Sequence, residues 1–200
     1  MNPTKLIEKH CGNNATAFRV ISEHGRRVAD KALAVADAVK HLKPDPAFIA
    51  EAALLHDIGI LFTDAPKLGC FGNHPYVCHG ILGRVLLEKE GYPRHALVCE
   101  RHVGVGISAE DVVKQKLPVP VRDMQPQSVE EQIICYADKF YSKNGGASEE
   151  KTTAEILNTL QRYGADKVQR FKAWMALFEP QRFEAVQPPG DGLPAEIKKQ

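Results

Sequence analysis

Apolar residues recur every three or four positions along most of the chain, which is the spacing of helices with one buried face. The clearest series runs from about Ala15 to Leu42. Asn13 and Asn14 precede it as candidate caps, and Pro44 ends it. A second helix is predicted from Asp45, followed by Pro at the first helical position, to Gly59.

Further helices are predicted beyond a loop that spans residues 61–74, where proline and glycine interrupt the pattern. One of them begins with a Ser-x-x-Glu capping box at Ser128. The segment 111–126 predicts one helical turn followed by a loop with several prolines. The remaining predictions are helices over residues 75–90, a short helix ending near 103, and helices over 128–143, 149–163 and 165–178, with a loop at 144–146.

The pattern contains no internal repeat and no convincing β-alternation, so the predicted fold is all-α with a single domain. Residues 1–14 are an N-terminal extension, and residues 15–145 form the main domain. Residues 146–186 form C-terminal helices packed on the same domain. The Pro- and Gly-containing residues 187–200 are predicted to be a flexible tail.

Composition narrows the function classes. The 200 residues are 44% hydrophobic, and 26 Lys and Arg balance 25 Asp and Glu, giving a formal charge of +1. This balance, without a dense basic run, argues against stable nucleic-acid binding.

The sequence also indicates a compartment. The longest stretch without Asp, Glu, Lys or Arg, Leu68–Gly83, contains four glycines and is too polar to span a membrane. The N-terminus lacks the apolar core of a signal peptide, and the five cysteines form no Cys-x-x-Cys pair, so we expect a cytoplasmic protein. A homodimer is left open.

Six polar side chains are predicted on an apolar helix face or at the inward end of a helix. His24, for example, is in register with Ile21 and Val28 and therefore points toward the core. Any one of these residues alone could be an ordinary hydrogen-bonded core residue. The full set is His24, His56, Asp57, His79, His102 and Asp138.

Taken together, the six residues favour a metal centre. An unpaired buried polar group costs about 1–3 kcal/mol, and a domain has only about 5–15 kcal/mol of stability in total. A metal centre would satisfy all six groups at once. Imidazole and carboxylate without thiolate suit Fe or Mn best, and Ni, Zn, Mg or Co also fit. In the adjacent pair His56–Asp57, the histidine can bind one ion while the carboxylate bridges to a second.

The string Ala-Leu-Leu-His-Asp-Ile-Gly around His56, with an upstream histidine and a downstream aspartate, resembles the HD-domain metal-dependent phosphohydrolase superfamily. More narrowly, it resembles the small stand-alone HDIG proteins, over roughly residues 15–145. The resemblance implies a primary metal site of His24, His56, Asp57 and Asp138. It also implies that His79 and His102 belong to a binuclear centre of two divalent ions, which Asp57 bridges.

Two other motifs have simpler interpretations. Gly91-Tyr92-Pro93 spells the name of the HD-GYP phosphodiesterases, but it precedes His102 instead of following paired histidines, so we interpret it as a helix break. Cys99 lies near His102 in the sequence, and a Cys–His nucleophile pair is the alternative to a small core residue. We favour the core residue.

The function implied by the resemblance is hydrolysis of a phosphoester of a small molecule, a nucleotide or related phosphate, by metal-activated hydroxide. Asp57 would be the catalytic residue that positions the hydroxide. The candidates for substrate binding are Arg27, Thr63, Asp64, Lys67, Arg101 and Lys139.

Two alternatives remain open at this stage. The mixed-valence di-iron oxygenases of the same superfamily, such as myo-inositol oxygenase, share the six-ligand set, so the ligands alone do not separate the two reactions. A catalytically inactive HD-like signalling module ranks third, because such modules typically lose ligands and all six are present here.

Overall fold

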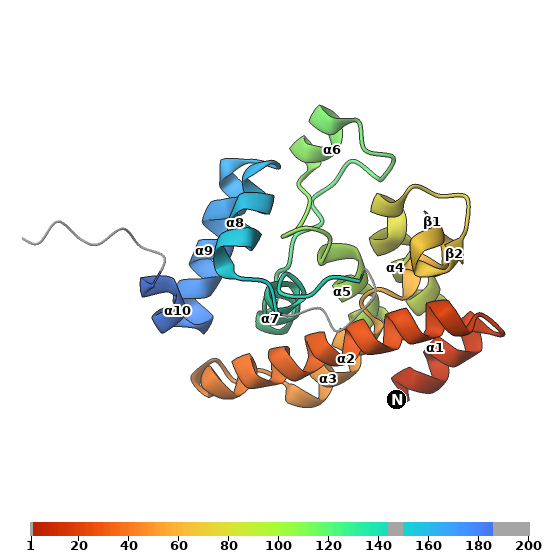
Figure 1. The fold of residues 1–200 in the computed structure, drawn as a ribbon, viewed down its shortest axis with the longest axis horizontal. Helices are drawn as coiled ribbons and strands as arrows, with labels where there is room; N and C mark the ends of the chain where they lie inside the picture. The colour runs from red at the N-terminus through yellow and green to blue at the C-terminus, as the bar shows by residue number, and fades with distance from the viewer. Residues whose placement is uncertain (1, 144–149, 186–200) are drawn as a thin grey trace, which may run out of the picture.

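Helix α2 (Ala15–Ala38) is the longest element and lies along one side of the molecule (Figure 1). The Asn14 side chain caps it by accepting a hydrogen bond from the Ala17 amide. Helix α3 (Pro46–Leu55), capped by Asp45, packs along α2, and α7 (Val129–Asp138) also contacts α2. This computed structural model describes residues 2–143 and 150–185.

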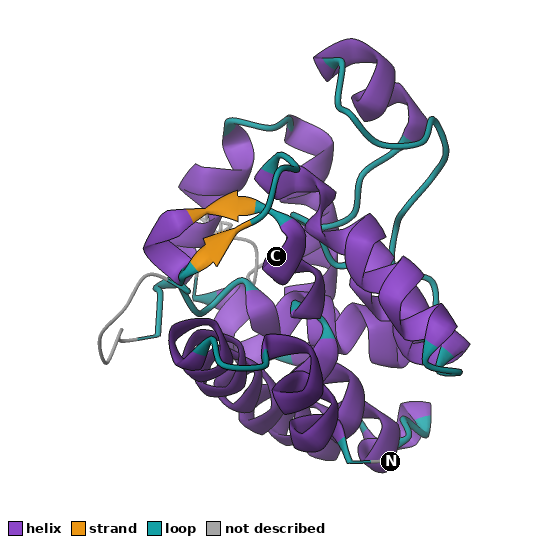
Figure 2. Ribbon diagram, turned by 90° about the vertical axis from the view of Figure 1, so that its right-hand side faces the viewer, coloured by secondary structure: helices purple, strands orange, loops and turns teal. Residues whose placement is uncertain are grey.

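Helices dominate the described residues (Figure 2), which confirms the all-α prediction. The predicted N-terminal extension itself contains helix α1 (Pro3–Cys11). This helix packs against α2 and α3 and buries Leu6, Ile7 and Cys11. The first residues of the chain therefore contribute to the core.

The segment predicted as a loop over residues 61–74 carries more structure than expected. A 3₁₀ helix (Ile58–Phe62) leads into strand β1 (Asp64–Ala65), which pairs antiparallel with β2 (Cys70–Phe71). A second 3₁₀ helix, Pro66–Leu68, joins the two strands. Strands of two residues are too short to show alternation, which is why the sequence pattern does not reveal them.

Helices α4 (His79–Lys89) and α5 (Pro93–Arg101) pack against each other. Helix α4 begins at His79 and not at Pro75, because Tyr76–Cys78 form a 3₁₀ turn. Gly91 has a positive φ of 83° between the helices, and Pro93 is the first residue of α5. The Gly91-Tyr92-Pro93 string is thus a helix break, as predicted.

Helix α6 (Ala109–Gln115) lies on an arm that projects from the rest of the chain (Figure 1). It occupies the first part of the segment that the sequence left ambiguous. A reciprocal capping box between Ser108 and Asp111 starts the helix. Asp111 also pairs with the buried Lys167 of α9 (Ala165–Phe178), which fixes the arm to the C-terminal helices.

The C-terminal helices are α8 (Thr153–Gln161), α9 (Ala165–Phe178) and α10 (Pro180–Glu184). Helix α9 has the predicted bounds and packs on α7. Helix α7 ends at Asp138, five residues before the predicted end at Lys143. At its start Ser128 caps the Glu131 amide, whereas the Glu131 carboxylate accepts from the Gln127 amide, so the predicted box is only half formed. The predicted loop at 144–146 and tail at 187–200 lie outside the described residues.

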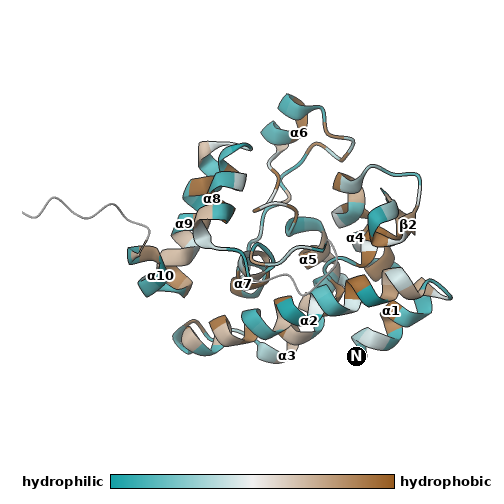
Figure 3. Ribbon diagram, viewed as in Figure 1, coloured by the Kyte–Doolittle hydropathy of each residue, from teal (hydrophilic) through white to brown (hydrophobic). Residues whose placement is uncertain are grey.

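The buried apolar residues form two clusters that meet along α2. Ala17 and Ile21 belong to the cluster with α1, α4 and α5, whereas Val28 and Ala32 belong to the cluster with α7, α8 and α9. Figure 3 shows hydrophobic and hydrophilic stretches alternating along α2. His24 lies between the two sets, so the polar residues of interest sit at the seam between two apolar cores.

Candidate metal centre

The six predicted ligands come from one helix interior and several helix ends. His24 lies within α2, whereas His79 is the first residue of α4. The other ligands lie where helices stop: His56 and Asp57 directly after α3, His102 directly after α5, and Asp138 as the last residue of α7. The helices end at the seam and present these side chains to one another.

Two glycines permit the close approach of the backbones that carry these ligands. A Cβ on Gly25 would lie 2.9 Å from the Leu54 carbonyl oxygen, so only glycine lets α2 pass this near to α3. A Cβ on Gly59 would lie 2.0 Å from the His79 carbonyl oxygen. Gly59 of the HDIG string therefore brings the segment after Asp57 against the start of α4.

His24, His56, Asp57 and Asp138 form the first ligand group, in which the candidate ligand atoms all lie within 4.8 Å of one another. His24 Nε2 lies 2.9 Å from Asp138 Oδ1 and 3.3 Å from Asp57 Oδ2. His56 Nε2 lies 3.2 Å from Asp57 Oδ2 and 3.4 Å from Asp138 Oδ1. Two imidazoles and two carboxylates thus converge on one point.

Asp57, His79 and His102 form the second group. His79 Nε2 and His102 Nε2 are 3.1 Å apart, and they lie 3.5 and 3.2 Å from Asp57 Oδ1. Asp57 therefore turns one oxygen to each group. The carboxylate that the sequence predicted as a bridge thus faces both candidate ligand groups.

The donor set fits divalent metal ions. His56 Nε2 and Asp57 Oδ1 are buried and make no hydrogen bond within the described part of the chain, and the buried Asp57 Oδ2 lies 3.0 Å from the Lys143 ammonium. Orphaned buried polar atoms of this kind are costly unless an ion satisfies them. The Nδ1 atoms of His56, His79 and His102 lie 2.6–2.8 Å from backbone carbonyl oxygens. Donation to those carbonyls leaves each Nε2 as the free ligand atom.

The electrostatics of the site favour anionic carboxylates and deprotonated histidines of the second group. Burial opposes ionisation of Asp57, but the charges of His56 and Lys143 outweigh it and hold the Asp57 pKa well below its usual range. Burial, with the charge of His102, lowers the pKa of His79 to about 3. At His56 burial alone would lower the pKa, but the carboxylates of Asp57 and Asp138 outweigh burial and raise the pKa of His56 to about 9. A metal bound at His56 would therefore displace a proton.

Two lysines pair with the ligand carboxylates. Lys139 Nζ lies 2.6 Å from Asp138 Oδ2, and Lys143 Nζ lies 3.0 Å from Asp57 Oδ2. The sequence pattern indicates Lys139 but not Lys143 as a candidate, because it predicts a longer helix that ends at Lys143. The four-residue spacing of the two lysines at the end of the capped helix is the signal that could have found it.

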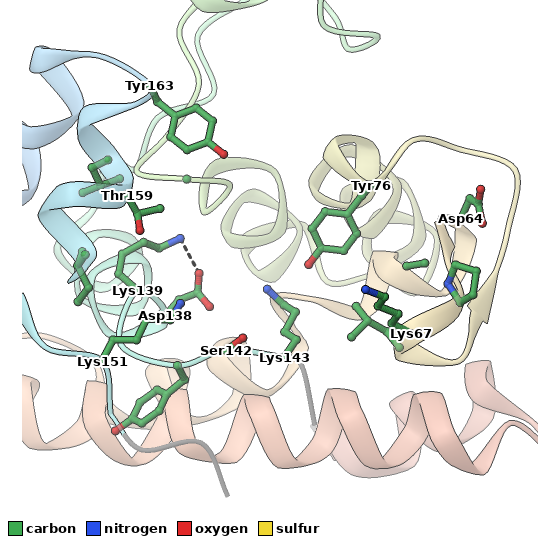
Figure 4. A pocket seen from close by; sticks show the side chains of 17 residues that line it. Asp64, Lys67, Tyr76, Asp138, Lys139, Ser142, Lys143, Lys151, Thr159 and Tyr163 are labelled. Carbon is green, nitrogen blue, oxygen red and sulfur yellow. Dashed lines mark ion pairs between the residues drawn. The ribbon is translucent and has the colours of Figure 1, made fainter. Parts of the chain in front are cut away.

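A cavity of about 600 Å³ opens on Asp138 (Figure 4). We call it the lysine chamber, because four lysines line it: Lys67, Lys139, Lys143 and Lys151. Asp64 lines it too, so the structure brings Asp64, Lys67 and Lys139 together as candidate substrate residues. Figure 4 shows the Tyr76 and Tyr163 hydroxyls pointing into this cavity from opposite sides.

The other three predicted substrate residues lie elsewhere. Thr63 is fully buried, and its hydroxyl donates to the Ile60 carbonyl, so it stabilises a turn. Arg101 makes a two-pronged ion pair with Glu131. Arg27 is half-buried on α2, and it does not line the lysine chamber.

Cys99 does not have the surroundings of a nucleophile. It is buried in an apolar cluster, and its thiol lies near the Leu55 carbonyl. Burial raises the pKa of this thiol well above its usual value, so the core-residue interpretation is retained.

Comparison with known proteins agrees with this geometry. The family model of the HD domain matches residues 21–142, a range that contains all six ligands. The chain belongs to the HD domain family. An uncharacterized protein of Methanocaldococcus jannaschii is 31% identical over 138 residues, which are 68% of this chain and 70% of that protein.

Other similar proteins are longer or more distant. A tRNA (cytidine(56)-2'-O)-methyltransferase of Picrophilus torridus is 34% identical over 124 residues, 62% of this chain. The match spans only 32% of that methyltransferase. The HD domain of the L. monocytogenes phosphodiesterase PgpH shares the fold at 18% identity and a TM-score of 0.52, with 89% of this chain and 91% of that chain covered.

A membrane span requires both a minimum helix length and a high hydropathy. None of the helices in residues 2–143 and 150–185 meets both requirements.

Proposed function

We propose that this HD protein is a metal-dependent phosphohydrolase that binds two divalent ions and acts on a small phosphoester. The observation that carries the proposal is the position of Asp57, which turns one oxygen to each of two buried ligand groups beside a chamber lined by lysines. Family membership and this ligand set support a hydrolase of the HD type. Fe or Mn suits the imidazole and carboxylate donors best.

Each group of the chain has a distinct task in this proposal. His24, His56 and Asp138 would hold one ion, His79 and His102 the other, and Asp57 both. When bound, the ions supply Lewis acidity and an activated water. Asp57 and Asp138 would then bind the ions and no longer neutralise Lys143 and Lys139. Both ammonium groups would become available to a substrate phosphate.

The lysine chamber supports an anionic substrate. Within residues 2–143 and 150–185, the ammonium groups of Lys67 and Lys151 form no ion pair. Burial, with the charges of Lys139 and Lys143, lowers the pKa of Lys151. Positive groups that repel one another in a half-buried cavity favour binding of an anion among them.

Metal stoichiometry tests the binuclear centre. His79→Ala should lower the ratio of metal to protein from near two to near one and leave the first group loaded. His74→Ala is a matched control, because His74 is exposed and belongs to neither group. A ratio near one in both the wild type and the His79 variant would show that the second group holds no metal.

The reaction itself is tested with phosphoesters after chelation and reloading. Mn²⁺ should restore phosphate release, the rate should be independent of dioxygen, and Asp57→Asn should abolish release while the chain stays folded. Turnover that consumes dioxygen, and that requires a partly oxidised di-iron form, would instead establish the oxygenase alternative. Metal binding without any turnover would favour the signalling module.

A further inference from the structure

A second cavity adjoins the lysine chamber on the side of His79. Its volume is about 390 Å³, and its walls share four residues with the lysine chamber: Tyr76, Gly104, Leu160 and Tyr163. The two cavities are therefore parts of one cleft. Asp138 lines the first and His79 the second, so the two ligand groups lie between them.

The second cavity differs sharply in character, and we call it the apolar chamber. Its charged residues Asp111 and Lys167 pair with each other and offer little to a ligand. Gln115 contributes a side-chain amide. The remaining walls outside the shared residues are mostly aliphatic side chains: Val77, Val103, Val105, Ile107 and Leu117.

We infer that the substrate is an alkyl or aryl phosphoester, whose phosphate lies at the lysine chamber and whose apolar group fills the apolar chamber. This inference rests on the proposed phosphohydrolase function. A nucleobase has several donors and acceptors, which would lose water in this chamber and find few partners. An aliphatic or simple aromatic group would be buried without that loss.

Binding of a homologous series tests the inference without turnover. Methyl-, butyl- and octylphosphonate would be titrated into the Mn²⁺-loaded full chain under anaerobic conditions, with calorimetry as the readout. Affinity should rise about three- to fourfold for each added methylene until the chamber is full, because each methylene removes apolar surface from water. The heat capacity change should become more negative along the series.

A pair of variants on the arm locates the effect. Leu117→Gln places an amide in the apolar chamber and should flatten the dependence on chain length while methylphosphonate binding stays unchanged. Val113→Gln is the matched control, because Val113 is 64% exposed on α6 and does not line the chamber. Thermal unfolding of both variants confirms that they fold.

The outcomes separate this inference from the proposed function. Affinity that does not depend on chain length, or a nucleoside monophosphonate that binds more tightly than octylphosphonate, would overturn the inference. A steep dependence on length, with no phosphate released from alkyl phosphates or any other ester, would overturn the phosphohydrolase and leave the apolar chamber assigned as a binding site.

Discussion

At the scale of single residues, Lys143 stands out because it approaches the carboxylate that both ligand groups share. Its Nζ lies 3.0 Å from Asp57 Oδ2, and its side chain is 17% exposed. Burial disfavours the charged lysine, but Asp57 and Asp138 outweigh that effect and raise its pKa. In the absence of metal, Lys143 is therefore a counter-charge for a buried anion.

Lys143→Met should destabilise the metal-free protein by about 2–3 kcal/mol, because it leaves Asp57 buried with less compensation. The loss should be much smaller with Mn²⁺ bound, because the ions then neutralise Asp57. Chemical denaturation in EDTA and in Mn²⁺ measures both values. Lys151→Met is the control, since Lys151 pairs with no carboxylate within the described ranges, and equal losses in both media would contradict the expectation.

The candidate ligands could be selected from the sequence at this scale, whereas the residues that line the lysine chamber could be selected only in part. Inward polar residues such as His24 and Asp138 conflict with the helical pattern, so they stand out in the sequence. Thr63 and Arg101 looked available because a sequence does not reveal a turn partner or a Glu131 that lies 30 positions away. Lys151 was missed because the sequence predicted a helix over 149–163, whereas the helix begins at Thr153 and leaves Lys151 in the segment before it.

At the scale of elements, the contact between the HDIG segment and α4 depends on Gly59. Gly59→Ala would force a Cβ into the His79 carbonyl, at 2.0 Å from its oxygen, and separate Asp57 from His79. We expect a loss of stability of more than about 3 kcal/mol and loss of the second metal. Denaturation and metal analysis measure these effects.

The control for this substitution is Gly91→Asn. Gly91 has a positive φ, which asparagine tolerates, and a Cβ there would meet nothing within 4 Å. That variant should lose about 1 kcal/mol or less and keep both metals. A Gly59→Ala protein that behaved in the same way would show that the HDIG segment can move away from α4 without harm to the centre.

The arm that carries α6 has a pH-dependent attachment. Burial opposes ionisation of Asp111, but hydrogen bonds from Lys167 and Ser108 outweigh it and lower the Asp111 pKa from its ordinary value. A lowered carboxyl pKa adds stability that is present above the unfolded value and is lost as the pH falls through the folded value.

Hydrogen exchange of the α6 amides should therefore accelerate, relative to intrinsic rates, as the pH falls below about 4. In Asp111→Asn this acid-dependent part should be absent, and α6 should exchange faster than in the wild type at neutral pH, because Lys167 loses its partner. Protection of α6 that is identical in both proteins at neutral pH would show that Asp111 does not hold the arm.

At the scale of the whole molecule, the centre joins α2, α3, α4, α5 and α7 at the seam of the two apolar clusters. Ions that bind only the folded chain should stabilise it by about 2.7 kcal/mol at one hundred times Kd. For a chain of this size, the melting temperature should rise by about 5–10 °C.

Calorimetric melting against Mn²⁺ concentration checks this linkage. The Asp57→Asn variant should lose most of the rise, because its side chain no longer offers two anionic oxygens. A melting temperature that does not change with Mn²⁺ concentration would show that the folded chain has no preformed centre.

The all-helical architecture could be predicted from periodicity, whereas α1 and the two short strands could not, because segments of two to nine residues give weak patterns.

His24 and Asp138 are 114 residues apart in the sequence. An ion held by both would close a very long loop, as a covalent crosslink does, and would restrict the unfolded chain accordingly. Such a link can form only after α2 and α7 have met, so it would slow unfolding more than it would speed folding. The lifetime of the native chain against proteases would then be set by how slowly the metal leaves.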